Sequence, residues 1–160
     1  MQRDFLIVLP VDPMPIGTVY PTGQRMPLHS TLMPWFGLSN TLTRASLEEK
    51  LGELARGLDI TLISDRPEYF TGADNKQGVP VHALKPNETL MTLHLDILDF
   101  LHEHHATIRN IAHVGSNYRP HVTTVDGREF TSQRTHRVSE IVLIQRHGNT
   151  REVIQTFLCP

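Results

Sequence analysis

Apolar and polar positions alternate with a strand period in the first part of the chain. The apolar run Phe5–Val11 predicts one strand, and Leu28–Phe36 predicts a second. Side chains two residues apart on a strand point to the same face. The alternation therefore puts His29, Thr31 and Met33 together on one face of the second strand.

The pattern then changes to a helical one. Ser46 followed by Glu49 has the spacing of a capping box, which predicts a helix start at this point. Gly57 predicts its end. The apolar positions that recur with helical spacing are Leu47, Leu51, Leu54, Ala55 and Leu58.

The middle of the chain repeats the order of strand and helix. Residues 59–64 (DITLIS) and 79–84 (VPVHAL) predict two strands, and the polar stretch 66–78 between them is predicted to be a loop. Asn87 is placed to cap a second helix from Glu88 to about His105. The apolar residues of this helix are Leu90, Leu93, Ile97, Leu98 and Leu101.

The C-terminal part is again rich in β-branched residues. His121–Val125 predicts a strand, and Val138–Gln145 with Glu152–Leu158 predicts a closing hairpin around RHGNTR. The order is then β, β, α, β, β, α, β, β, β, which predicts an α+β fold with mostly antiparallel sheet. Residues 1–160 are interpreted as a single domain, in which each half holds one helix and one His-x-Thr strand.

These two His-x-Thr strands carry the candidate chemistry. His29 with Thr31, and His121 with Thr123, each lie two residues apart on a strand, or about 6–7 Å on one face. Because an imidazole titrates near neutrality, one can act as general base while the other acts as general acid. Threonine hydroxyls are compact donors to phosphate oxygens. The pattern predicts attack on a phosphodiester with no metal and no cofactor.

A single His-x-Thr string is weak evidence, since it is typical of an ordinary strand histidine. The string HATI at His105 also matches, but it lies at a helix end, where residues two apart do not share a face. The segment HEHH invites a metal site, because His102 and His105 have the spacing of helical ligands. No acidic or cysteine pattern completes such a site, so a solvated helix end is favoured.

Composition narrows the class of ligand. The chain has 15 basic and 17 acidic residues and a formal charge of −2, which excludes a protein with a basic face for duplex nucleic acid but not one that binds a small nucleotide. The single cysteine, Cys159, cannot form a disulfide within the chain and favours a cytoplasmic location. No apolar run is long enough to span a membrane. We expect a monomer.

Further residues are candidates for substrate contact. Trp35 falls on the predicted face of Thr31 and could stack on a base, although core packing is equally consistent with its position. Tyr118 and Arg119 directly precede the second motif, and Arg119 is either a phosphate contact or a surface residue. Tyr69 and Phe70 in the predicted loop could form a lid over a nucleobase.

The chain resembles the two-histidine phosphoesterases, which include LigT-like 2′-5′ RNA ligases and cyclic nucleotide phosphodiesterases. LHSTLMPWFG is similar to the first motif strand of that family, and YRPHVTTV to the second, with Thr124 where the family usually has an apolar residue. The resemblance implies two similar lobes of antiparallel sheet with helices packed outside and a central groove. It also implies that His29 and His121 are the catalytic pair, and that Thr31 and Thr123 bind phosphate.

The substrate stays open at this point. A 2′,3′-cyclic phosphate, a 2′-5′ linkage and a phosphodiester of a cyclic oligonucleotide all fit the motifs, and the family also includes RNA ligases. A rival of another class is a nucleotide-binding module that keeps the pocket without catalysis. The presence of both histidines and both threonines favours the enzyme. A purely structural α+β domain would require both motif pairs to be accidental.

Overall fold

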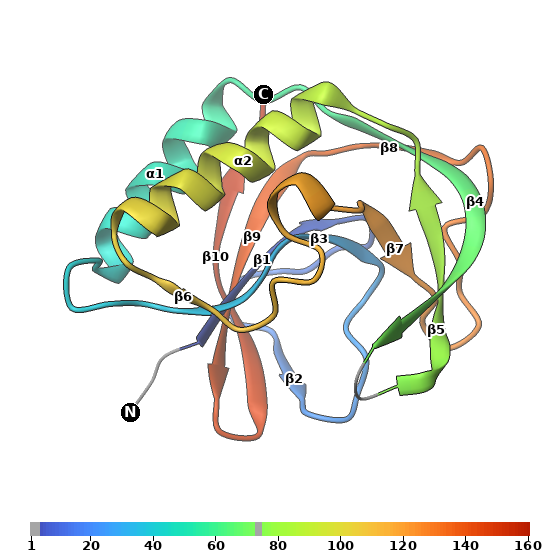
Figure 1. Ribbon diagram of the computed structural model, residues 1–160, viewed down its shortest axis with the longest axis horizontal. Coiled ribbons are helices and arrows are strands. Elements are labelled where there is room, and N and C mark those ends of the chain that lie inside the picture. The colour runs from blue at the N-terminus through green and yellow to red at the C-terminus, as the bar shows by residue number, and fades with distance from the viewer. Residues whose placement is uncertain (1–3, 73–74) are drawn as a thin grey trace.

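The computed structural model describes residues 4–72 and 75–160, which form one long curled sheet with two helices on its outer side (Figure 1). The sheet order is β2-β10-β9-β1-β3-β7-β5-β4-β8, and β6 pairs with β3 at one end. The pairings among the described residues are antiparallel, which confirms the predicted fold class. The strands are β1 Asp4–Pro10, β2 Val19–Pro21, β3 His29–Gly37, β4 Thr61–Gly72, β5 Asn75–Leu84, β6 Thr107–Ile108, β7 His121–Thr123, β8 Thr135–Arg137, β9 Glu140–His147 and β10 Thr150–Leu158.

The helices are α1 Arg44–Arg56 and α2 Glu88–Glu103, with a short 3₁₀ turn, η1, at Gly115–Asn117. Both helices lie on the same side of the sheet (Figure 1), where α1 packs on β9 and β10 and α2 packs on β3. The larger apolar core fills the space between them and the sheet. A smaller cluster covers the opposite face around β1, β9 and β10. Neither α1 nor α2, in the part of the chain described, is long and apolar enough to cross a membrane.

The sheet consists of a first half, β2-β10-β9-β1-β3, and a second half, β7-β5-β4-β8, which meet at β3 and β7. Ser30 pairs with Val122 at this junction, and both side chains are buried. An ion pair also joins the halves, since the Arg128 guanidinium donates to both Asp12 carboxylate oxygens, at 2.6 and 3.0 Å. Asp12 lies before β3 and Arg128 lies after β7, so the pair connects the chain segments that flank the two motif strands.

The helix boundaries follow their capping residues. In α2 the Asn87 side chain accepts a hydrogen bond from the Leu90 N–H at 3.0 Å, as predicted. In α1 the predicted capping box at Ser46 is wrong, because Thr43 is the N-cap and its hydroxyl oxygen accepts from the Ser46 N–H at 3.1 Å. Ser46 therefore lies inside the first turn. The predicted end at Gly57 is confirmed.

The polar stretch between residues 66 and 78 was predicted to be a loop, and this is wrong. The described part of it belongs to β4 and β5, which pair as a long hairpin, for example through Tyr69 and Pro80. Strand prediction depends on alternating buried apolar residues, and this stretch is mostly polar. Even its aromatic residue Tyr69 is 73% exposed. Residues 73 and 74 of the predicted loop lie outside the described residues. The short strands β2, β6 and β8 also carry no recognisable sequence pattern.

Met33 does not share a face with His29 and Thr31, as the strict alternation predicted. Along β3 the partners on β1 change from Val8 opposite Thr31 to Ile7 opposite Met33, so two steps on β3 face one step on β1. This bulge turns Met33 to the helix side, where it is fully buried in the larger core. The extra residue leaves His29 and Thr31 on the other face.

Candidate active site

The two motif strands lie side by side at the junction of the half-sheets. Ser30 pairs with Val122, and both point into the core on the helix side. If this antiparallel register is continued by one residue in each direction, each histidine lies opposite the threonine of the other strand. The motif side chains on that shared face, all of them partly exposed, are His29, Thr31, His121 and Thr123.

Both imidazoles are held in the same way. The Nδ1 atom of His29 lies 2.7 Å from the Pro27 carbonyl oxygen, and that of His121 lies 2.8 Å from the Arg119 carbonyl oxygen. Because a carbonyl oxygen only accepts hydrogen bonds, Nδ1 must carry the proton in each ring. The Nε2 atom of each ring is then the one that can take or give a proton.

Burial lowers the pKa of His29, because it disfavours the charged imidazolium. The Pro27 carbonyl opposes this effect, whereas the positive charges of His121 and Arg151 add to it. His29 is also the more enclosed ring of the two, since its hydrogen bond is partly buried and that of His121 is exposed. His29 is therefore favoured as the neutral member of the pair.

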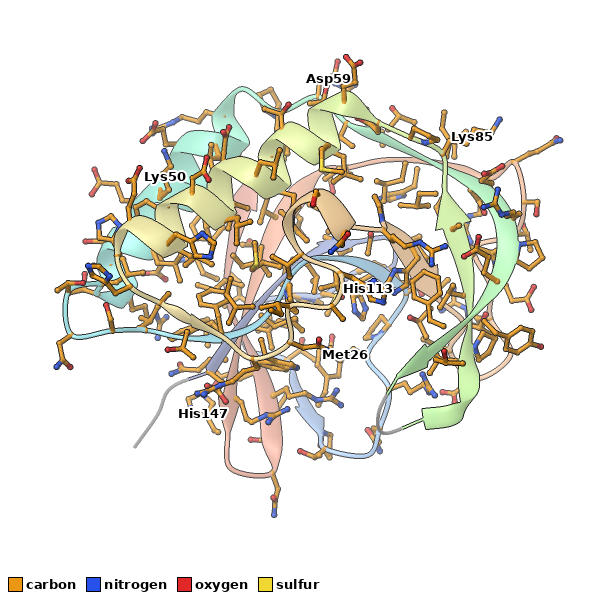
Figure 2. The ribbon with its side chains drawn as sticks, in the orientation of Figure 1. Met26, Lys50, Asp59, Lys85, His113 and His147 are labelled. Carbon is orange, nitrogen blue, oxygen red and sulfur yellow. The ribbon has the colours of Figure 1, made fainter. Side chains whose placement is uncertain are left out.

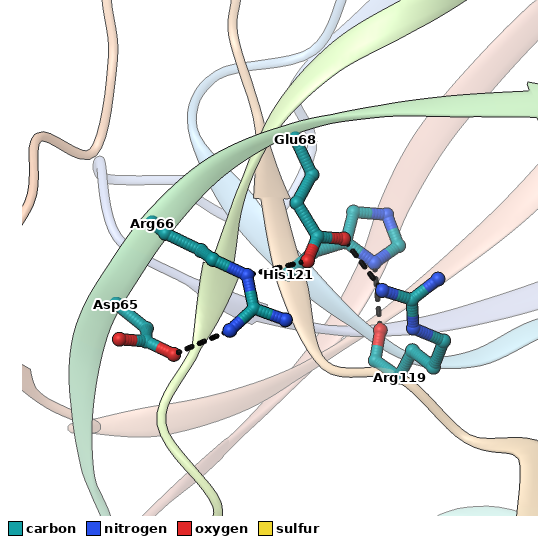
Figure 3. A network of polar contacts seen from close by, with 5 residues as sticks. All are labelled: Asp65, Arg66, Glu68, Arg119 and His121. Atoms are coloured by element: carbon teal, nitrogen blue, oxygen red, sulfur yellow. Dashed lines mark hydrogen bonds and ion pairs between the residues drawn. The ribbon is translucent and has the colours of Figure 1, made fainter.

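His121 has a different electrostatic environment. Burial again lowers its pKa most, and the charges of His113 and Arg119 lower it further, but the Glu68 carboxylate raises it. Figure 3 shows Glu68 at the centre of a polar network beside His121. Its two oxygens accept from Arg66 Nε at 2.9 Å and from Arg119 Nη2 at 2.5 Å. Of the two histidines, His121 is thus the one with a carboxylate near its ring.

The His121 ring packs against an aromatic side chain of β4. The Phe70 ring lies 4.4 Å from the His121 ring and 5.5 Å from His113, between centroids. His113, labelled near the middle of Figure 2, lines a pocket of about 140 Å³ together with Thr31 and His121. Sequence reasoning missed His113, which lies in a loop with no motif. Phe70 contacts His121 directly, as a residue of β4 and not of a loop.

Tyr118 holds the backbone of β3 at Thr31. Its hydroxyl donates to the Thr31 carbonyl oxygen at 2.9 Å, and its ring stacks on His94 at 3.9 Å between centroids. His94 in turn donates from Nδ1 to the Leu32 carbonyl and accepts at Nε2 from the Gly115 N–H. Tyr118 was predicted as a substrate contact. It borders the pocket, but its hydroxyl is used to hold β3.

The His94 contacts predict that stability decreases in acid. Both ring nitrogens are used by the neutral form, and burial lowers the pKa of His94. The unfolded state therefore binds the proton first as pH falls below about 6.5, and the free energy of unfolding decreases, by at most about 1.4 kcal/mol per pH unit for one group. The pKa values of His29, His121 and His136 are also lowered, and they act with the same sign.

Urea unfolding at pH 7.5 and pH 5.5 measures this effect. His94→Gln is expected to show a smaller loss of unfolding free energy between the two pH values than the wild type, because glutamine does not titrate. His102→Gln, at an exposed position of α2, is the matched control and should keep the wild-type loss. An equal loss in His94→Gln and in the wild type would contradict the prediction.

A second group of residues lies on the same side of the sheet, over the first half. Arg151 of β10 pairs with Arg146 of β9 and with Tyr20 of β2. The Arg146 guanidinium lies 4.6 Å from the Trp35 ring centroid, and Trp35 packs on the smaller apolar cluster. Arg151 donates to the carbonyls of Pro21 and Gln24, and its Nε atom is buried with no hydrogen-bond partner among the described residues.

Sequence reasoning missed Arg146 and Arg151, although the predicted hairpin contained a signal. The two residues flank the turn symmetrically, so a hairpin places them opposite one another on one face. The positive charge of Arg151 repels the imidazolium form of His29 and so lowers the pKa of His29. Trp35 is also on this side of the sheet, under a guanidinium and against the apolar cluster.

Within residues 4–72 and 75–160, no group of three or more His, Cys, Asp or Glu side chains gathers in a way that could hold a metal ion. The helical spacing of His102 and His105 is not realised. Helix α2 ends at Glu103, and His105 has a positive φ of 57°. The two histidines therefore do not share a helical face.

Comparison with solved structures identifies the fold. E. coli LigT in complex with 3′-AMP matches with 15% identity, 99% coverage of each chain and a TM-score of 0.58. A structure described as a phosphoesterase matches with 17% identity, 99% coverage of each chain and a TM-score of 0.59. E. coli LigT in complex with ATP matches with 17% identity, 99% coverage of each chain and a TM-score of 0.53.

No protein-family model and no curated protein sequence matches the chain. The likeness is therefore one of fold over almost the whole chain. The chain has the LigT-like fold, as its resemblance to the two-histidine phosphoesterases implied.

Proposed function

We propose that this chain, built on the LigT-like fold, is a metal-independent phosphodiesterase that acts on a nucleotide or a short oligonucleotide. The observation that carries the proposal is the matched pair of imidazoles. His29 and His121 lie on adjacent strands, each donates Nδ1–H to the carbonyl two residues earlier, and each keeps Nε2 for the substrate. A threonine of the opposite strand accompanies each ring.

The roles of the two histidines follow from their surroundings. His29 acts as general base, because the nearby Arg151 charge favours its neutral form. His121 acts as general acid, because of the two rings it is the one beside a carboxylate, that of Glu68 (Figure 3), which favours the protonated form against the opposing charges of His113 and Arg119. His29 Nε2 takes a proton from the attacking water as the new P–O bond forms, and His121 Nε2 gives a proton to the leaving oxygen as the old P–O bond breaks. Thr31 and Thr123 donate hydrogen bonds to the non-bridging oxygens.

The compared structures support a nucleotide as the ligand. LigT has been solved with 3′-AMP, NADP⁺ and ATP, all of which carry an adenosine and phosphate groups. In this chain Arg151 supplies positive charge near His29, Arg146 lies opposite Arg151 on β9, and Trp35 and Tyr20 supply aromatic surface on the same side of the sheet. Arginine and aromatic side chains are the groups that hold phosphates and bases of single-stranded nucleic acid.

One experiment distinguishes an enzyme from a nucleotide-binding module that has no catalytic activity. The protein is incubated with 2′,3′-cyclic nucleotides, 2′-5′ oligoadenylates and cyclic dinucleotides, with a metal chelator present, and the products are separated. Turnover of at least one substrate class is expected with the chelator present. Binding without turnover for every class would favour the non-catalytic module. Activity that is lost with the chelator and restored by zinc or manganese would contradict two-histidine catalysis.

Removal of either threonine hydroxyl is expected to weaken substrate binding. Thr31→Val and Thr123→Val keep the shape of the side chain and remove one hydrogen bond to a charged phosphate. Such a bond contributes about 1.5–3 kcal/mol, so KM should rise about 10- to 150-fold.

Thr124→Val is the matched control, because Thr124 directly follows β7 and the motif threonine of that strand. It should keep the wild-type KM. A KM that rises as much in this control as in the motif variants would show that the effect is structural.

A further inference from the structure

A larger cavity lies beyond His121, over the second half of the sheet. Its volume is about 440 Å³, and it is bounded by β4, β5, the first turn of α2 and the segment just before β7. This volume is in the range of small-molecule sites, about 300–1,000 Å³. Its apolar lining includes Phe70, Ala83, Leu84, Met91 and Pro120.

The cavity adjoins His121. Ala83, which lines it, is the cross-strand partner of His121, so the two lie about 5 Å apart between neighbouring strands. Tyr118 and Arg119 line both this cavity and the small pocket over Thr31 and His121. A substrate whose phosphate contacts His121 would therefore extend directly into the cavity on that side.

The charged groups of the cavity argue against a second phosphate. Asp65, Glu68 and Glu88 supply three carboxylates, and Arg66 and Arg119 supply two guanidinium groups. Arg66 forms ion pairs with Asp65 and Glu68, at 3.6 and 2.9 Å, and Arg119 forms one with Glu68 at 2.5 Å, so the two positive charges are already matched by two carboxylates. The first half of the sheet differs in charge, since Arg146 and Arg151 make its surface positive. An uncharged, flat group with N–H donors suits apolar walls edged by carboxylates.

We propose that this cavity binds the nucleoside that carries the leaving oxygen. The inference rests on the proposed function, in which His121 protonates that oxygen. The group attached to the leaving oxygen must then lie on the His121 side, and the cavity is the space on that side. The preferred substrate is therefore a phosphodiester between two nucleosides, with the leaving nucleoside bound over β5 and the remaining phosphate-bearing part over the arginine pair.

Two esters that share one scissile phosphate test the subsite. One is an adenylyl dinucleotide, whose leaving group is a nucleoside, and the other is the same adenylate as a methyl phosphodiester, whose leaving group is methanol. The wild type is expected to prefer the dinucleotide in kcat/KM. Met91→Trp places an indole in the cavity and should reduce the ratio of the two kcat/KM values at least tenfold. An unchanged ratio would overturn the proposal.

Leu95→Trp is the matched control, because Leu95 lies on the same helix, is 37% exposed and does not line the cavity. It should keep the wild-type ratio. Binding of the four ribonucleosides, followed by NMR, separates this proposal from the proposed function. If neither these esters nor any of the three substrate classes above is cleaved, the proposed function fails, yet nucleoside binding that Met91→Trp abolishes still supports the subsite. A wild type that binds none of the four overturns the subsite.

Discussion

Replacement of either His29 or His121 by alanine is expected to lower kcat by about 10²–10⁴-fold, the usual contribution of a positioned general acid or base. In the proposed function each imidazole offers its Nε2 atom to the same phosphodiester, and alanine provides no group that can move a proton. The loss should appear in kcat on every substrate that the wild type cleaves. Steady-state kinetics of the two single variants and of the double variant measure it.

The two losses should not add, because both residues serve one transition state. The double variant is expected to be about as slow as the slower single variant. His102→Ala is the control, since His102 lies at an exposed position in the last turn of α2. His105 would be a poorer control, because its positive φ makes an alanine there strained. Wild-type kcat in either motif variant would refute the assignment of the catalytic pair.

The rate is also expected to depend strongly on pH. The profile of kcat/KM should be bell-shaped, since the base must be neutral while the acid is protonated. Burial lowers the pKa of both His29 and His121. The maximum for the free enzyme should therefore lie below about pH 6.5, the value for an unperturbed histidine. Each limb should approach a tenfold change per pH unit.

The position of each limb on the pH axis depends on one charged neighbour of the histidine. Arg151 lowers the pKa of His29, so Arg151→Met should raise it and move the acid limb to higher pH. Glu68 raises the pKa of His121, so Glu68→Gln should lower it and move the alkaline limb to lower pH. Each variant is expected to narrow the profile from one side. Movement of the opposite limb in both variants would reverse the roles of the two histidines.

Bound substrate adds a further check on the same profile. An anionic phosphodiester between the rings stabilises both imidazolium forms and raises their pKa values. The kcat profile, which reports the complex, should therefore lie at higher pH than the kcat/KM profile, which reports the free enzyme. Coincident profiles would indicate that the phosphate does not contact the histidines.

The sequence predicted those parts of the fold that depend on local chemistry. The α2 cap at Asn87 and the closing hairpin follow from short-range rules, and the motif strands follow from strong β patterns. The β4–β5 hairpin escaped prediction because its polar, exposed face removes the apolar alternation on which strand prediction depends. The bulge at Met33 escaped because it is fixed by pairing with β1, a partner far away in the sequence.

The same distinction applies to the site. The motifs made His29 and His121 candidates because residue type and spacing on a strand are visible in one segment. Glu68, His113 and Arg151 come from other strands and loops, and only the sheet order brings them near the two rings. Their effect on the pKa values could not be deduced from the chain alone. Tyr118 likewise shows its supporting role only through its contact with the Thr31 carbonyl.

The long-range joining of the two half-sheets at β3 and β7 has a consequence for folding. His29 and His121 are separated by 121 − 29 = 92 positions in the chain, and the pairing of Ser30 with Val122 brings them onto neighbouring strands. Contacts of such long sequence separation form late, because a large loop must close before they stabilise anything. A partly folded chain in which only one half is formed has one imidazole in place and no partner for it. Under the proposed function, turnover requires this long-range contact, so the return of activity during refolding reports when the contact forms.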